Sequence, residues 1–96
     1  MIHELLAAGS HNARTGKEIA KLIGCDLRRV TIQIERERRE GWPICANTLG
    51  VNAGYYLAES SFELDRYITR LGRRARELMK TKRALQKTLK KQQPCI

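Results

Sequence analysis

The 96-residue sequence has few cysteines, no long hydrophobic run and a shortage of acidic residues. Its three cysteines, Cys25, Cys45 and Cys95, are odd in number and form no C-x-x-C pair. This pattern argues against a disulfide framework and favours reduced thiols, and the cysteines and histidines lack zinc-finger spacing. No apolar stretch approaches the roughly 20 residues of a membrane span. The start lacks the regions of a signal peptide, so we expect a cytoplasmic protein.

Residue patterns typical of catalysis are also missing. Gly50 and Gly54 are not followed by the Lys-Ser/Thr of a phosphate-binding loop. His3 and His11 lie in or beside the first predicted helix, and we expect His3 at the surface. Cys25 stands at a predicted helix start, where thiol pKa values tend to fall, but we favour a packing role for it. We therefore predict no enzyme, no cofactor, no metal site and, in so short a chain, no small-molecule effector.

Positive charge is in excess and lies mainly towards the C-terminus. The chain has 19 Lys and Arg against 10 Asp and Glu, a formal net charge of +9. Residues 1–59 are nearly balanced, whereas residues 60–96 hold eleven basic and three acidic side chains. This excess favours a polyanionic partner, usually nucleic acid and alternatively an anionic membrane surface. A basic solvated surface without a partner is the third interpretation.

Residues 15–24 predict a short helix. Thr15 and Glu18 have the spacing of a capping box at its start. Gly24 is expected to end it, because glycine readily adopts the left-handed conformation of a helix C-terminal cap. The predicted apolar face consists of Ile19, Leu22 and Ile23.

A second helix is predicted from Asp26 to Glu40, directly after a tight turn. Asp26 suits its N-cap, and Leu27, Val30 and Ile34 give it a buried face. Two helices joined by a turn, with basic and amide side chains on the second, are typical of a helix-turn-helix. The outer residues of the second helix are Arg28, Arg29, Thr31, Gln33 and Arg36.

Further elements are predicted on both sides of this pair. A short helix over 2–8 precedes it, followed by a polar connector over 10–14 that could contain a short strand. Apolar runs at 42–46 and 55–58, around a loop rich in Gly and Asn, predict a β-hairpin. Residues 1–59 are therefore expected to form one domain, mainly α with a small β-hairpin.

The segments TGKEIAKLIGCDLRRVTIQIERERREGWPI and GYYLA carry a resemblance over about two thirds of the chain. They resemble the amino-terminal, winged helix-turn-helix domain of the biotin-repressor type and its bacterial and phage relatives. The matching positions are Glu18, Ile19, Ala20, Leu22, Gly24, Val30, Ile34, Gly41, Ile44, Gly54, Tyr55 and Leu57. The family usually has an apolar residue where this chain has Glu37. Either that end of the helix is less buried, or Trp42 covers that part of the core.

The resemblance implies a DNA interface. The second helix of the pair would enter the major groove, and the hairpin would lie along the adjacent backbone or minor groove. Arg and Gln are the usual partners of guanine and adenine there. The residues implied are Arg28, Arg29, Thr31, Gln33 and Arg36 on the helix, and Asn47, Thr48 and Asn52 on the hairpin loop. The alternative for Arg36, Arg38 and Arg39 is a mixed-charge solvated face, which we favour for Arg38 and Arg39.

The C-terminal part, residues 60–93, predicts one long helix. Ser60 and Glu63 have capping-box spacing, and Gly72 could mark a bend. Leucine occupies every d position of four heptads, which predicts a coiled coil. The seam comprises Leu64, Ile68, Leu71, Ala75, Leu78, Leu85 and Leu89, with Lys82 at the remaining a position. We favour a parallel homodimer; the alternative is that this helix folds back on its own domain.

The other faces of this helix are basic and are expected to bind phosphates without reading sequence. The residues involved are Arg66, Arg70, Arg73, Lys80, Arg83 and Lys87. We do not expect membrane binding, because the apolar face has no Trp or Phe beyond Phe62. The predicted function is sequence-specific binding of double-stranded DNA by a small, phage-type transcriptional regulator acting as a dimer. The alternative is an interaction or architectural module whose basic helix docks an acidic partner.

Overall fold

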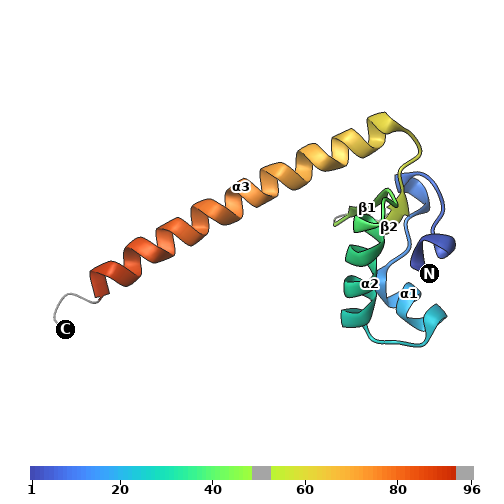
Figure 1. Cartoon of the computed structure of the whole chain (residues 1–96), viewed down its shortest axis with the longest axis horizontal. Coiled ribbons are helices and arrows are strands. Elements are labelled where there is room, and N and C mark those ends of the chain that lie inside the picture. Colours follow the sequence, from blue (N-terminus) through green and yellow to red (C-terminus); the bar gives the residue numbers. More distant parts are fainter. Residues whose placement is uncertain (49–52, 93–96) are drawn as a thin grey trace.

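The computed structural model describes residues 1–48 and 53–92, as a small domain from which one long helix projects (Figure 1). Its elements are η1 (Ile2–Leu5) and η2 (Ser10–Asn12), both 3-10 helices, then α1 (Gly16–Ile23), α2 (Leu27–Arg39), β1 (Ile44–Asn47), β2 (Gly54–Leu57) and α3 (Ser61–Gln92). This confirms the predicted fold class, mainly α with a small β-hairpin and a long C-terminal helix. Within the described ranges, no helix is both long and apolar enough to cross a membrane.

Helices α1 and α2 begin and end as the sequence predicts. The Thr15 hydroxyl oxygen accepts a hydrogen bond from the Glu18 amide at 3.1 Å, and the Glu18 carboxylate accepts one from the Thr15 amide at 3.4 Å. Gly24 follows α1 with a φ of 70°, in the left-handed region. The Asp26 carboxylate caps α2 by accepting from the Arg29 amide at 2.9 Å. These local interactions fix where α1 and α2 begin.

The core is smaller than predicted. Of the expected apolar faces, Ile19, Val30 and Ile34 are buried, but Leu22, Ile23 and Leu27 are about half exposed. At the N-terminus, the predicted helix over 2–8 is only the single 3-10 turn η1. So short an element covers less of α1 and α2 than a full helix would. The buried core cluster is Ile2, Leu6, Ile19, Val30, Ile34 and Ile44.

The hairpin is present, with strands displaced slightly from the predicted ranges. Strands β1 and β2 pair antiparallel, with Ile44 opposite Leu57 and Asn47 opposite Gly54. The N-terminal segment joins the other edge of β2 through isolated bridges at Ala8 and Arg14. The predicted short strand in the connector is therefore reduced to the bridge at Arg14, whose amide donates to the Tyr55 carbonyl at 2.9 Å.

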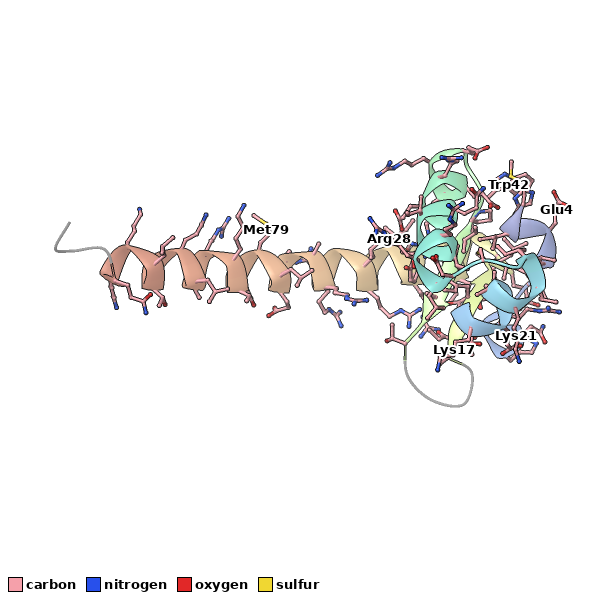
Figure 2. All side chains as sticks on the ribbon, turned by 90° about the horizontal axis from the view of Figure 1, so that it is seen from below. Glu4, Lys17, Lys21, Arg28, Trp42 and Met79 are labelled. Atoms are coloured by element: carbon pink, nitrogen blue, oxygen red, sulfur yellow. The ribbon has the colours of Figure 1, made fainter. Side chains whose placement is uncertain are left out.

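Helix α3 starts at the predicted cap and leaves the domain. The Ser60 hydroxyl oxygen accepts from the Glu63 amide at 3.1 Å, and the Glu63 carboxylate accepts from the Glu59 amide at 2.7 Å. The helix continues through Gly72 without interruption. Helix α3 meets the domain near β1 and then projects away from it (Figure 1). Along the long axis of the molecule, α2 lies between α1 and the projecting part of α3 (Figures 1 and 2). The alternative in which this helix folds back on its own domain is therefore wrong.

Replacing Gly54 by alanine tests the packing of the hairpin on the N-terminal segment. Gly54 has a φ of 135°, and a Cβ there would overlap the backbone of Arg14. We expect Gly54→Ala to lower the free energy of unfolding by about 1–3 kcal/mol, measured by thermal unfolding followed by circular dichroism. The control is Gly72→Ala, because its Cβ would meet only the Arg76 guanidinium at 3.7 Å. Equal stability of the Gly54 variant and the wild type would contradict this account.

Candidate nucleic-acid interface

The exposed side of α2 carries a row of arginines around a shallow hollow. Helix α1 and η1 pack on the opposite side of α2, which contains the buried residues Val30, Ile34 and Glu37. The hollow has a volume of about 530 Å³ and faces solvent. Its lining residues are Asp26, Arg28, Arg29, Ile32, Gln33 and Arg36. The structure thus brings together four of the five helix residues proposed for DNA contact.

The arginines of this face have no acidic partner. The side chains of Arg28, Arg29 and Arg36 make no hydrogen bond or ion pair to any residue of 1–48 or 53–92. The predicted mixed-charge face forms in part: Glu35 pairs with Arg38 at 2.7 Å, whereas Glu37 is buried. Arg39, which we expected on that solvated face, is exposed and likewise unpaired within the described chain. The hollow is therefore lined by three arginines and one acidic residue, Asp26, and carries a net positive charge.

Two of the predicted helix residues have intramolecular partners. The Thr31 hydroxyl donates to the Leu27 carbonyl at 3.1 Å, and Thr31 does not line the hollow. The Gln33 amide nitrogen donates to the Glu37 carboxylate at 2.9 Å and to the Met1 sulfur at 3.8 Å. A bidentate contact to adenine would need that same amide nitrogen. In this structure Gln33 therefore supports Glu37 while its side chain borders the hollow.

A fully buried carboxylate lies directly behind this face. Glu37 is 0% exposed. Its carboxylate accepts hydrogen bonds from the backbone amides of Ile2 at 2.9 Å and His3 at 2.7 Å, and from Gln33. The His3 Nδ1 lies 2.6 Å from the same carboxylate. The departure from the family pattern at Glu37 is thus a buried polar cluster, so the explanation that this end of the helix is less buried is wrong.

The environment of Glu37 keeps it ionised. Burial alone raises the pKa of this carboxyl, but the hydrogen bonds from His3, Gln33 and Ile2 outweigh burial and lower the pKa from 4.5 to about 2. Trp42 covers the cluster by stacking on the His3 ring, with centroids 3.6 Å apart. Only 11% of the His3 side chain is exposed, so the expectation that His3 lies at the surface is wrong.

Arg38 fixes the start of α3 to α2 and the hairpin. Its Nε donates to the Ile44 carbonyl at 2.9 Å, and its terminal nitrogens donate to Glu35 at 2.7 Å and to the Tyr67 hydroxyl at 3.0 Å. From α3, the Arg70 guanidinium lies 5.7 Å from the Tyr67 ring centroid. The expectation of a solvated Arg38 is therefore wrong: it links three elements, which side-chain periodicity along one helix does not reveal.

The described part of the hairpin loop meets α3 beside two arginines. Thr48 is exposed and lines a small hollow of about 100 Å³ with Arg70, Leu71 and Arg74 of α3. Asn47 is half-buried, and its amide donates to the Ser10 carbonyl at 3.3 Å. Asn52 lies outside the described residues. Of the two predicted loop residues that the structure describes, Thr48 is therefore the one whose surroundings suit contact with a phosphate.

Helix α3 presents both a basic surface and an apolar stripe to solvent. The predicted phosphate-contacting residues of α3 are all exposed, and Lys80 pairs with Glu77 at 3.2 Å. The apolar seam residues Ile68, Leu71, Leu78, Leu85 and Leu89 are 47–65% exposed. Leu64 is half-buried near the domain, and no residue of α3 is fully buried. Figure 2 shows side chains, Met79 among them, all around the free part of this helix.

Two of the three cysteines lie in the part of the chain that the structure describes. Cys25 and Cys45 are free thiols, and burial raises the pKa of Cys45. The Cys25 thiol is half-buried, and it donates to the Asp26 carbonyl at 3.4 Å. Over residues 1–48 and 53–92, no three His, Cys, Asp or Glu side chains form a group that could hold a metal ion. Cys95 lies outside the described residues.

Comparison with known protein families, curated proteins and solved structures finds no match for this chain. The residues and their arrangement therefore carry the functional argument.

Two features of this interface were not predicted from the sequence. Ile32 lies among the arginines of the hollow. The sequence could have revealed this, because Ile32 is two residues from both Val30 and Ile34. Two residues turn a helix by about 200°, which places Ile32 on the side opposite that buried pair. The Glu37 cluster was visible only as an acidic residue at an expected core position. Its partners Ile2 and His3 are more than 30 residues away in the sequence, so helix periodicity could not identify them.

Acid should destabilise the protein through Glu37. Its folded pKa lies below the ordinary value of 4.5, so its contribution is fully present above pH 4.5 and is lost as the pH falls towards 2. The predicted loss is roughly 3 kcal/mol, from 1.36 kcal/mol per pKa unit. Urea unfolding followed by the fluorescence of Trp42, the single tryptophan, measures it at each pH.

Two variants separate this effect from general acid denaturation. Glu37→Gln should have a lower free energy of unfolding than the wild type near neutral pH. Between pH 4.5 and about 2, that free energy should change much less with pH than it does in the wild type. Glu40→Gln removes an exposed carboxylate from the end of the same helix and should keep the wild-type dependence. An unchanged pH dependence in Glu37→Gln would show that another group is responsible.

Proposed function

We propose that this protein is a winged helix-turn-helix transcriptional regulator, of the small type found in phages, that binds double-stranded DNA sequence-specifically as a dimer. The observation that carries the proposal is the face of α2, where Arg28, Arg29 and Arg36 line one hollow and make no ion pair within the described chain. An exposed helix face with free guanidinium groups suits the major groove, where arginine pairs with the O6 and N7 atoms of guanine. Each such pair is typically worth about 1–3 kcal/mol of discrimination against the wrong base.

Helix α3 supplies the part of the DNA affinity that is independent of base sequence. Eleven of the 19 basic residues lie in this helix, against three acidic ones. Arg70 and Arg74 stand beside Thr48 of the hairpin loop, so loop and helix offer neighbouring donors for the DNA backbone. Phosphate contacts of this kind position a protein on the duplex and make its affinity fall steeply with salt.

The exposed stripe on α3 supports dimerisation. Leu78, Leu85 and Leu89 together with Lys82 line one shallow apolar groove on the free part of the helix. A stripe of leucines at heptad spacing is covered in coiled coils by a matching helix, and a second copy provides one. Two copies paired in parallel would present two α2 faces to the half-sites of a symmetric DNA site.

A second candidate function is docking of an acidic helix. The free half of α3, from Leu78 onward, carries only basic ionisable side chains, so a homodimer brings like charges together. An acidic amphipathic helix would cover the same stripe and neutralise that charge. Oligomerisation measurements separate this candidate from the dimer.

The DNA proposal is tested by selecting duplexes from a random library and measuring fluorescence anisotropy over a salt series. Arg28→Ala/Arg29→Ala should remove the preference for the selected duplex over a scrambled one. Lys90→Ala/Lys91→Ala removes the same charge from the end of α3 and should weaken both duplexes alike. Removing one phosphate contact should reduce the slope of log affinity against log salt by about 0.9. No binding at low salt, or no preferred sequence, would overturn the proposal.

The dimer is tested by sedimentation equilibrium with and without the selected duplex. The wild type should reach a dimer as concentration rises, and Leu78→Asp/Leu85→Asp should remain a monomer with its helical circular dichroism largely retained. Lys80→Asp/Lys87→Asp introduces the same two aspartates at positions that do not line the apolar groove and should still dimerise. A wild-type monomer under all conditions would instead favour the acidic partner.

A further inference from the structure

Ile32 is an apolar side chain set among the arginines of the α2 face. It lines the same hollow as Arg28, Arg29 and Arg36, and it is 52% exposed. Val30 and Ile34, its neighbours two residues away on either side, are both buried. Ile32 therefore lies nearly opposite the core, at the part of the helix that would reach deepest into a groove.

The surroundings of Ile32 give it no apolar partner within the hollow. Arg28 and Arg36 lie four residues before and after it, so their side chains are its neighbours along the helix surface. The other residues of the hollow are Asp26, Arg29 and Gln33, all polar or charged. A single exposed isoleucine is ordinary on a protein surface. What distinguishes Ile32 is that it is the apolar residue in a hollow whose other lining side chains are polar or charged.

In the major groove, one base carries an apolar group. Thymine presents its C5 methyl group there, and apolar side chains make contact with it, whereas the other bases present hydrogen-bonding groups. The flanking arginines would pair with guanine, and an isoleucine between them cannot hydrogen-bond to any base. We propose that Ile32 is a specificity-determining residue that selects thymine through contact with its C5 methyl group.

This inference rests on the proposed DNA-binding function and adds a base preference to it. It implies that a thymine lies next to the guanines read by the arginines. It also implies that the methyl group, rather than the hydrogen-bonding groups of thymine, is what Ile32 recognises. Deoxyuridine tests this directly, because it pairs with adenine as thymine does and differs from it only in lacking the methyl group.

The experiment uses the full chain and the best duplex that it selects from a randomised library. Each thymine of that duplex is replaced singly by deoxyuridine, and affinity is measured by fluorescence anisotropy at constant salt. One position should weaken binding about fourfold, the effect expected for one buried methylene-sized group. In Ile32→Ala the same replacement should weaken binding less than in the wild type, because the shorter side chain makes less contact with the methyl group, while Ile32→Leu should retain more of the effect.

Controls separate this inference from the function on which it rests. Leu22→Ala removes an equally exposed apolar side chain from α1 and should leave the discrimination against deoxyuridine unchanged. A selected duplex whose deoxyuridine derivatives all bind the wild type equally would overturn the role of Ile32 and leave DNA binding intact. Equal discrimination by Ile32→Ala and the wild type would also overturn it. Selection of no preferred sequence would overturn both proposals.

Discussion

The buried carboxylate of Glu37 is the constraint on which the domain depends. A charged group without solvent must be satisfied by hydrogen bonds, and here the amides of Ile2 and His3 and the Gln33 side chain supply them. Those donors come from two segments, so satisfying the charge holds the N-terminal turn against α2. Trp42 closes this region from the outside by stacking on His3. Because η1 is only one turn long, it has little apolar surface to pack on α2. The hydrogen bonds from its backbone amides to Glu37 therefore help to hold it in place.

Helix α2 is held on its inner side by two adjacent residues of opposite charge. Glu37 binds the N-terminal segment, and Arg38 binds the Ile44 carbonyl and the Tyr67 hydroxyl. Consecutive residues on a helix point about 100° apart, so these two reach different neighbours. Since both inner charges are engaged, the outer arginines are the ones left for a partner. The same contacts also set where α3 leaves the domain relative to the arginine face of α2.

Helix α3 combines two properties that normally oppose each other. Its leucine stripe favours association, whereas its excess of basic side chains resists the approach of another basic helix. Phosphates on DNA would reduce that repulsion, which makes DNA binding and pairing of the helices compatible. No residue of α3 is fully buried, so its capping and its length contribute more to its helical structure than packing on the domain does.

Local patterns in the sequence determined the elements of this protein. The capping residues Thr15, Asp26 and Ser60 and the positive-φ glycine Gly24 act on their immediate neighbours, so the ends of α1 and the starts of α2 and α3 could be predicted closely. The basic residues of α2 could likewise be assigned to an outer face from periodicity.

Contacts between distant segments could not be predicted in this way. Burial of Glu37 and His3, engagement of Arg38 by Tyr67, and exposure of Leu22 and Leu27 all depend on which segment packs where. Periodicity indicates that a side chain faces a core but not what that core contains. Only the tertiary structure therefore decided which charges are satisfied internally and which stay on the surface, because that requires the positions of partners far apart in the chain.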